Sequence, residues 1–217
     1  DFLEKKIKEL NFFYNFKEKI QKNNNVSLIS EIKKASPSAG ILIDKFNHLD
    51  IAKMYVDNGA TCLSVLTEEK YFLGKLNYIY DIKSKFKIPT LAKDFFIDPY
   101  QVALSKSYGC DCILIIIAAL SGNQIKEIYS EALKHKLSVI VEVHDQKEAE
   151  IALNYEDALI GINNRNLKTL KTDINTTYDI YDVVKTHKGP LISESGIRTK
   201  EELLNLNNKT SINTFLI

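Results

Sequence analysis

The sequence lacks the features of a disulfide-bonded or metal-binding protein. Its 217 residues contain three cysteines, Cys62, Cys110 and Cys112, which are too few for a disulfide framework. Cys110 and Cys112 are separated by one residue rather than by the two-residue spacer of common metal and redox motifs. They also stand at the start of an apolar stretch, so we expect buried, reduced thiols. This cysteine content fits a reducing cytoplasm.

The chain also lacks an excess of either charge and lacks a long apolar run. The sequence has 29 Lys and Arg against 28 Asp and Glu, a net charge of +1, which argues against a nucleic-acid-binding surface. The longest apolar run, residues 113–120, is far too short to span a membrane. Residues 1–6 do not have the order of a secretory signal. We therefore predict a cytoplasmic globular protein with neither nucleic-acid nor membrane partners.

Apolar stretches typical of strands alternate with stretches of helical spacing. Residues 2–21 have helical spacing, with an interruption, and three asparagines follow. Helices are then predicted near residues 50–58, 76–82, 99–108, 122–135, 145–153, 174–186 and 200–206. Asp98-Pro99 and Thr199 resemble helix N-termini, and Gly59 and Gly109 resemble helix ends. The strands are predicted at residues 27–33, 61–66, 89–93, 112–117, 138–143, 158–162, 191–193 and 212–217.

This alternation repeats about every 25 residues and favours a parallel sheet with helices between its strands. Eight strands at this spacing predict an α/β protein with a (β/α)₈ (TIM) barrel. We expect a single domain, with residues 1–25 as an N-terminal helical extension and residues 26–217 as the barrel. The alternative, a doubly wound open sheet, usually has a Gly-rich phosphate turn after its first strand, and this sequence has none there.

Polar residues stand at the end of most predicted strands. In a strand, alternate side chains share a face, so Glu31 and Lys33 project together. A single pair of this kind is commonly a structural ion pair. Here, however, polar residues recur at the ends of most predicted strands, and in a barrel the carboxyl ends of the strands surround one opening. Crowded charges there would perturb one another's pKa values, which is a condition for acid–base catalysis. The other strand-end groups are Thr67 and Glu68, Lys93 and Asp94, Glu142 and His144, Asn163 to Arg165, and Glu194 to Gly196.

Other kinds of site are less consistent with the sequence. His144 is the only histidine beside a carboxylate near a predicted strand end, so a metal site lacks a second histidine. We expect His48, His135 and His187 to be solvated on helices or at their ends. Covalent catalysis through a Schiff base would be open to Lys93 or Lys33.

Two further groups of residues suggest substrate contacts. Ser195 and Gly196 lie between a strand and a capped helix, where free N–H groups and the helix dipole favour a phosphate. Ser36 and Lys33 would add a hydroxyl and a charge. Phe72 and Phe95 would either line a pocket for a flat ring or pack as core or lid residues.

A set of sequence blocks spans most of the chain. The blocks are Glu31-Ile-Lys-Lys-Ala-Ser-Pro-Ser38, Ser64-Val-Leu-Thr-Glu68, Tyr71-Phe-Leu-Gly74, Lys93-Asp-Phe95, Val141-Glu-Val-His144, Gly161-Ile-Asn-Asn-Arg-Asn-Leu167 and Ser193-Glu-Ser-Gly-Ile197. In their order and spacing, from about Phe12 to the end, these blocks resemble the indole-3-glycerol phosphate synthase family. That family is a (β/α)₈ barrel of tryptophan biosynthesis that uses neither metal nor organic cofactor.

The resemblance implies a phosphorylated small-molecule substrate and a role for each matching residue. Lys93 would be the general acid, and Glu142 and Glu31 the acid–base carboxylates. Lys33 would bind the substrate carboxylate or supply a second acid. The residues that would complete the catalytic site are Asn163, Glu194 and Ser195, which would orient substrate and lysine. Those that would bind substrate are Ser36 and Gly196 for the phosphate, Phe72, Phe95 and Leu114 for the anthranilate ring, and Arg165 in support.

The resemblance also bears on the ends of the chain. The family continues past its eighth strand with a phosphate-binding Gly and Ser loop and a final helix, whereas this sequence stops at Ile217. We therefore expect a barrel truncated after strand eight, from a protein that is monomeric or fused to another tryptophan-pathway domain. The nearest alternatives are another phosphate-binding barrel, such as phosphoribosylanthranilate isomerase, and a non-catalytic barrel kept as an interaction module.

Overall fold

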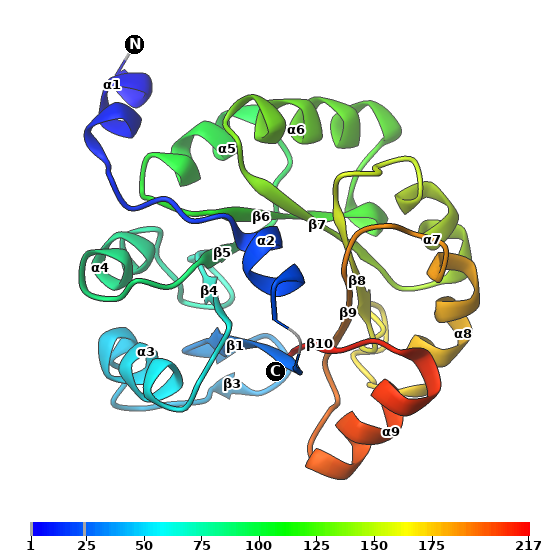
Figure 1. Cartoon of the computed structure of the whole chain (residues 1–217). Coiled ribbons are helices and arrows are strands. Elements are labelled where there is room, and N and C mark those ends of the chain that lie inside the picture. Colours follow the sequence, from blue (N-terminus) through cyan, green and yellow to red (C-terminus); the bar gives the residue numbers. More distant parts are fainter. Residues whose placement is uncertain (1, 24) are drawn as a thin grey trace.

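The computed structural model, which describes residues 2–23 and 25–217, is built around a closed barrel of eight parallel strands (Figure 1). The barrel closes where β1 pairs with β10 on one side and with β4 on the other. This topology confirms the predicted (β/α)₈ barrel. In chain order its strands are β1 (Ser27–Ile32), β4 (Cys62–Leu66), β5 (Thr90–Lys93), β6 (Cys112–Ile116), β7 (Ser138–Val143), β8 (Leu159–Asn163), β9 (Leu191–Glu194) and β10 (Thr214–Leu216).

Helices surround this barrel, one after each strand as far as β9 (Figure 1). Their buried sides pack on a continuous shell of aliphatic residues that alternate outward along the strands. None of the helices described is long and apolar enough to cross a membrane. The helices are α3 (His48–Asp57), α4 (Asn77–Lys85), α5 (Pro99–Lys106), the 3₁₀ turn η1 (Ile117–Ala119), α6 (Gly122–Lys134), α7 (Gln146–Ala152), α8 (Asn175–Val184) and α9 (Lys200–Thr210).

Local capping residues fix where several helices begin. Asp98 accepts a hydrogen bond from the N–H of Tyr100 and precedes Pro99, so α5 starts as the sequence predicts. Thr199 caps α9 with a pair of hydrogen bonds: its hydroxyl oxygen accepts the N–H of Glu202, and the Glu202 carboxylate accepts the N–H of Thr199. The structural boundaries lie within a few residues of the predicted ones. One pair of strands was not predicted: β2 (Ala35–Ser36) and β3 (Gly40–Ile41) form a short antiparallel hairpin after β1.

The N-terminal segment covers one end of the barrel. Helix α1 (Phe2–Glu9) lies outside, near α5, while α2 (Phe16–Gln21) lies across the barrel opening (Figure 1). Phe16 and Ile20 are buried among inward-facing residues of the strands, including Leu91 and Leu159. The bottom of the barrel is therefore filled by this helix, and the opposite opening is left for a site.

A buried ion pair joins this segment to the strands. Asp111 pairs with Lys83, and both side chains are fully buried. The N–H of Tyr14 donates to Asp111 Oδ1 at 2.6 Å, and the Lys83 ammonium lies 4.0 Å from the centroid of the Tyr14 ring. Burial lowers the pKa of Lys83 to about 8 against the raising effect of Asp111. The cluster ties residues far apart in the chain into one network.

Two predictions about titratable side chains have different outcomes. All three cysteines are buried, as predicted, and burial raises the pKa of Cys110 to about 12. The prediction that His135 is solvated is wrong. It is buried at the end of α6, where Glu131 Oε1 lies 2.9 Å from its Nε2 and Glu4 of α1 lies nearby. His187 is also half-buried, with Nε2 2.8 Å from the carbonyl oxygen of Ala158.

Candidate active site

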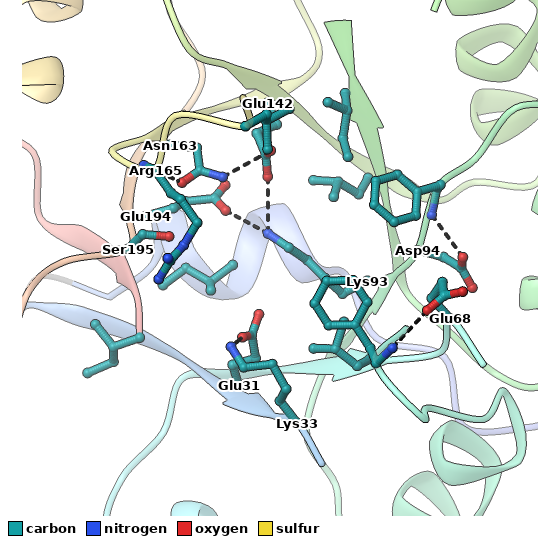
Figure 2. A pocket seen from close by; sticks show the side chains of 18 of the residues that line it. Glu31, Lys33, Glu68, Lys93, Asp94, Glu142, Asn163, Arg165, Glu194 and Ser195 are labelled. Atoms are coloured by element: carbon teal, nitrogen blue, oxygen red, sulfur yellow. Dashed lines mark hydrogen bonds and ion pairs between the residues drawn. The ribbon is translucent and has the colours of Figure 1, made fainter. Parts of the chain in front are cut away.

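A cavity of about 360 Å³ opens at the carboxyl ends of the barrel strands. Its polar lining comes from strand ends and from the loops that follow them, so side chains distant in the sequence face one another (Figure 2). The apolar lining includes Leu114 and Ile116 of β6 together with Leu216 of β10. The cavity thus combines a charged floor with an apolar wall.

Lys93, the last residue of β5, occupies the centre of the charged floor (Figure 2). Its Nζ lies 2.7 Å from Glu194 Oε2 and 3.2 Å from Glu142 Oε2, and the side chains of Lys93, Glu194 and Glu142 are 15%, 1% and 2% exposed. Burial alone would lower the pKa of Lys93, but Glu194, Glu142 and Glu31 outweigh it and raise this pKa above its ordinary value. Lys93 is therefore an ammonium at neutral pH.

The two carboxylates that hold Lys93 have different environments. Burial favours the neutral form of Glu142, but Lys93, His144 and Asn163 outweigh it and hold the pKa of Glu142 well below its usual range. Burial raises the pKa of Glu194 to about 7, against the lowering effect of Lys93 and with an added contribution from the charge of Glu142. Two carboxylates with separated pKa values on one lysine form a typical acid–base arrangement.

The geometry of Glu194 explains its raised pKa. Its Oε2 faces Lys93, but its buried Oε1 has no hydrogen-bond partner among the residues that the structure describes. An ionised oxygen without a donor is poorly stabilised in a buried position. The carboxylate lies directly over Gly161 of β8: a Cβ added there would stand 2.1 Å from Glu194 Oε1. Glycine at this position leaves the space that the carboxylate occupies.

Glu31 and Lys33 form an ion pair at the end of β1, and both line the cavity. In Figure 2 this pair lies across the cavity from Glu142, and the Glu31 carboxylate faces the amino end of Lys93. The hydroxyl of Tyr55 donates to the backbone carbonyl of Glu31 at 3.2 Å and fixes the strand end. The prediction that Glu31 and Lys33 share a face is confirmed.

Two residues at the end of β8 and just after it hold the Glu142 carboxylate and the loop that follows β8. The Asn163 side-chain amide donates to Glu142 Oε1 at 3.1 Å, and its Oδ1 accepts the N–H of Arg165 at 3.0 Å. The Arg165 guanidinium donates to the carbonyl oxygen of Leu170 at 3.0 Å. Arg165 therefore closes the loop at the edge of the cavity, and Asn163 orients the carboxylate.

The backbone after β9 has an unusual conformation. Ser195 and Gly196 both have positive φ values, 67° and 82°, a region that favours glycine. The side chain of Asn164 donates to the carbonyl oxygen of Ser195 at 3.1 Å and supports the turn. Ser195 and Gly196 both line the cavity, as predicted. Ser36 does not line it: it lies in the β2–β3 hairpin, with Oγ 3.4 Å from that of Ser38.

Aromatic residues flank the cavity entrance. The ring centroids of Phe72 and Phe95 are 6.4 Å apart, with the rings tilted at 47°, and both rings line the cavity. The Glu68 carboxylate accepts the N–H groups of Lys70, Tyr71 and Phe72 and so folds the loop that carries Phe72. Asp94 similarly accepts the hydroxyl of Thr67 at 2.7 Å and the N–H of Phe95 at 2.8 Å. These two acids organise the entrance.

No group of three or more histidine, cysteine or carboxylate side chains, within residues 2–23 and 25–217, is arranged to bind a metal ion. The acid–base groups around Lys93 are instead engaged with one another.

Comparison with known proteins identifies the family. Residues 2–217 match the family model described as Indole-3-glycerol phosphate synthase. The chain belongs to this family. The protein named indole-3-glycerol phosphate synthase in Legionella pneumophila is 46% identical over 91% of this chain and 76% of its own length. The protein of the same name in Desulforamulus reducens is 41% identical over 93% of this chain and 76% of its own length.

Solved structures resemble the fold more distantly. Phosphoribosyl anthranilate isomerase from Thermotoga maritima superposes with a TM-score of 0.63 at 14% identity, covering 87% of this chain and 86% of that chain. At this level of identity the likeness shows the barrel alone.

The cavity contains almost all of the predicted site residues and several that sequence reasoning missed. Every predicted catalytic residue lines it, and so does every predicted substrate-binding residue except Ser36. The missed lining residues are apolar positions in or just after strands, where the sequence cannot separate a cavity wall from the core. They are Leu66, Ile116, Leu167, Ile197, Leu216 and Ile217.

Proposed function

We propose that this protein converts 1-(2-carboxyphenylamino)-1-deoxy-D-ribulose 5-phosphate to indole-3-glycerol phosphate, acting as a carboxy-lyase. The observation that carries the proposal is the Lys93 ammonium held between Glu142 and Glu194 at the floor of a cavity with an apolar wall, in a chain of this family. A cationic donor and an apolar wall suit a substrate with a carbonyl group and an aromatic ring.

The first step forms the indole ring. The arene carbon that bears the carboxylate attacks the ribulose carbonyl carbon, and the carbonyl oxygen takes a proton from Lys93. The anilino nitrogen activates the arene because its lone pair delocalises into the ring. The ammonium supplies both the proton and positive charge where the oxygen becomes negative, which are two established sources of rate enhancement.

Carbon dioxide and water then leave. The bond to the carboxylate breaks, and its electron pair restores the aromatic ring. The new hydroxyl is then protonated and departs as water, and the adjacent ring carbon, which is bonded to the nitrogen, loses a proton so that the indole double bond forms. Glu142 and Glu31 would carry the protons of these steps, and Lys33 would either bind the departing carboxylate or act as a second acid. The pKa of about 7 at Glu194 lets that residue take back a proton near neutral pH while it orients Lys93.

Substrate binding would use the two sides of the cavity. Phe72, Phe95 and Leu114 would enclose the anthranilate ring, and the turn at Ser195 and Gly196, which precedes α9, would bind the phosphate. The predicted phosphate contact of Ser36 would require the β2–β3 hairpin to approach the cavity. A cytoplasmic location and a monomeric or fused state stay predictions.

The direct test is turnover of the synthetic carboxyphenylamino substrate, followed by the fluorescence of the indole product. Formation of indoleglycerol phosphate with release of one carbon dioxide per product supports the proposal. The same protein is offered the substrate of phosphoribosylanthranilate isomerase, the nearest alternative. Turnover of that substrate alone would replace the proposed function by the isomerase reaction, and no turnover of either would favour a non-catalytic barrel.

A further inference from the structure

His144 follows β7 immediately and lies behind the Glu142 carboxylate, outside the cavity lining. Its Nε2 is 3.1 Å from Glu142 Oε1, an ion-pair contact without the alignment of a hydrogen bond. Its Nδ1 is 3.0 Å from Glu148 Oε2, the same oxygen that accepts the backbone N–H of His144 at 2.8 Å. The imidazole is thus placed between two carboxylates, one in the site and one in the first turn of α7.

This placement favours one protonation state. An ionised carboxylate only accepts hydrogen bonds, so a ring with a carboxylate at each nitrogen is best satisfied when both nitrogens carry a proton. Burial opposes that charge, but Glu142 and Glu148 outweigh it and raise the pKa of His144 to about 9. Other charged side chains near the ring are Asp145 and Lys147 at the start of α7 and Asp179 of α8, which line a groove with His144.

Glu148 is itself fixed in position. The N–H of Glu148 donates at 2.9 Å to the side chain of Asp145, which is the N-cap residue of α7. The helix dipole also favours a carboxylate, such as that of Glu148, in the first turn of a helix. A rigid chain of contacts therefore runs from the start of α7 through the imidazole to the carboxylate that faces Lys93. Asn163 holds the same Glu142 oxygen from the neighbouring strand at 3.1 Å.

We propose that His144, anchored by Glu148, is a positioning residue that keeps the Glu142 carboxylate ionised and aimed at Lys93. The proposal rests on the proposed function, in which Glu142 transfers protons. An imidazolium behind the carboxylate neutralises part of the charge that two further glutamates, Glu31 and Glu194, bring to the same floor. Without it, the crowded carboxylates would compete for one lysine and Glu142 would take up a proton at a higher pH.

The kinetic test uses His144→Phe, His144→Gln and Glu148→Gln. His144→Phe removes charge and donors, so kcat is expected to fall by about tenfold or more, a part of the 10²- to 10⁴-fold that a positioned acid or base contributes. The acidic limb of the profile of kcat against pH is expected to move up by about 1–3 pH units, because the substitution removes the positively charged imidazolium that contacts the Glu142 carboxylate. KM is expected to stay nearly constant, since His144 lines no part of the cavity. His144→Gln, which keeps a donor without the charge, should recover part of kcat.

Glu148→Gln tests the anchor. It removes the charge on the outer side of the imidazole and leaves an oxygen that can accept the backbone N–H, so α7 should keep its first turn. The pKa of His144 is then expected to fall from about 9 toward its ordinary value, and the alkaline limb of the kcat profile moves to lower pH. Glu131→Gln is the matched control, because Glu131 contacts His135 at the same four-residue spacing away from the cavity. It should leave both limbs in place.

A measurement on the protein without substrate separates this proposal from the proposed function. The NMR titration of the His144 ring, assigned by its loss in His144→Gln, should have a midpoint well above the ordinary value and should fall by at least one unit in Glu148→Gln. If the wild type turns over no substrate, the proposed function fails and this titration still decides the placement. An ordinary midpoint unchanged in Glu148→Gln would overturn the proposal, and so would a wild-type kcat profile in His144→Phe.

Discussion

Gly161 offers a way to move one carboxylate of the cavity, that of Glu194, without replacing it. In Gly161→Ala the added Cβ would stand 2.1 Å from Glu194 Oε1, 3.2 Å from its Cδ and 3.0 Å from Ile140 Cγ2. Because ordinary contacts between heavy atoms are longer, the carboxylate must retreat by at least about 1 Å. That displacement breaks the 2.7 Å contact between Glu194 and Lys93.

The magnitude follows from the geometry. A misplacement of about 1 Å in a catalytic constellation costs on the order of 10²-fold in rate, so kcat of Gly161→Ala is expected to fall by about that factor. The methyl group also overpacks the barrel interior, which typically costs about 1–3 kcal/mol of unfolding free energy. The protein should therefore stay folded while its turnover falls. Turnover of the carboxyphenylamino substrate and urea unfolding, measured on the same preparations, separate the two effects.

Two further variants sharpen this test. Adding Glu194→Asp to Gly161→Ala withdraws the carboxylate by roughly one C–C bond, about 1.5 Å, so part of the lost stability should return without a return of activity. Gly122→Ala is the control: its Cβ would meet nothing within 4 Å, and Gly122 is the first residue of α6. It should keep full turnover and unfold no more easily than the wild type. Wild-type kcat and stability in Gly161→Ala would refute the placement of Glu194 over Gly161.

Three other predictions concern stability and substrate binding. Asp111→Asn leaves the buried Lys83 without its counter-charge and should lower the free energy of unfolding, measured in urea, by about 3–5 kcal/mol; a loss below about 1 kcal/mol would contradict the buried pair. Phe95→Ala should raise KM by about 10- to 150-fold, since burying one aromatic ring contributes about 1.5–3 kcal/mol, with little change in Tm; an unchanged KM would place the ring outside the binding surface. His144, whose pKa is raised to about 9 in the folded protein, contributes stability that is fully present below its ordinary value near 6.5 and is lost as pH rises through 9. Tm of the wild type should therefore fall over this window more than that of His144→Phe, and parallel curves would argue against a charged imidazole.

The sequence predicts the barrel and the convergence of its charges because both follow from local patterns. Strands of continuous apolar residues separated by helices can form only a few parallel sheets. Once such a sheet closes, every strand ends at the same opening. Lys93 and Glu142 therefore meet although they are 49 residues apart in the chain. The hydrophobic periodicity and the positions of the strand ends are therefore enough to predict that these two residues lie close together.

The remaining features depend on contacts that no local pattern specifies. Ser36 lies away from the cavity because β2 and β3 pair in a hairpin too short to have a strand signal. His135 is buried at the end of α6, and the fold brings Glu4 of helix α1 to within 3.9 Å of it, a contact between residues far apart in the chain. The difference between the pKa values of Glu142 and Glu194 depends partly on which of the two the Asn163 amide reaches, and only the three-dimensional register of β7, β8 and β9 decides that.

Turnover of Lys93→Ala is the decisive measurement, because the proposed chemistry depends on an ammonium held between two carboxylates. Removing it should lower kcat by about 10²- to 10⁴-fold, the contribution of a positioned general acid. Lys53→Ala, which removes an exposed lysine that pairs with Asp57 on α3, should keep full activity. Unchanged turnover in Lys93→Ala would rule out Lys93 as the general acid.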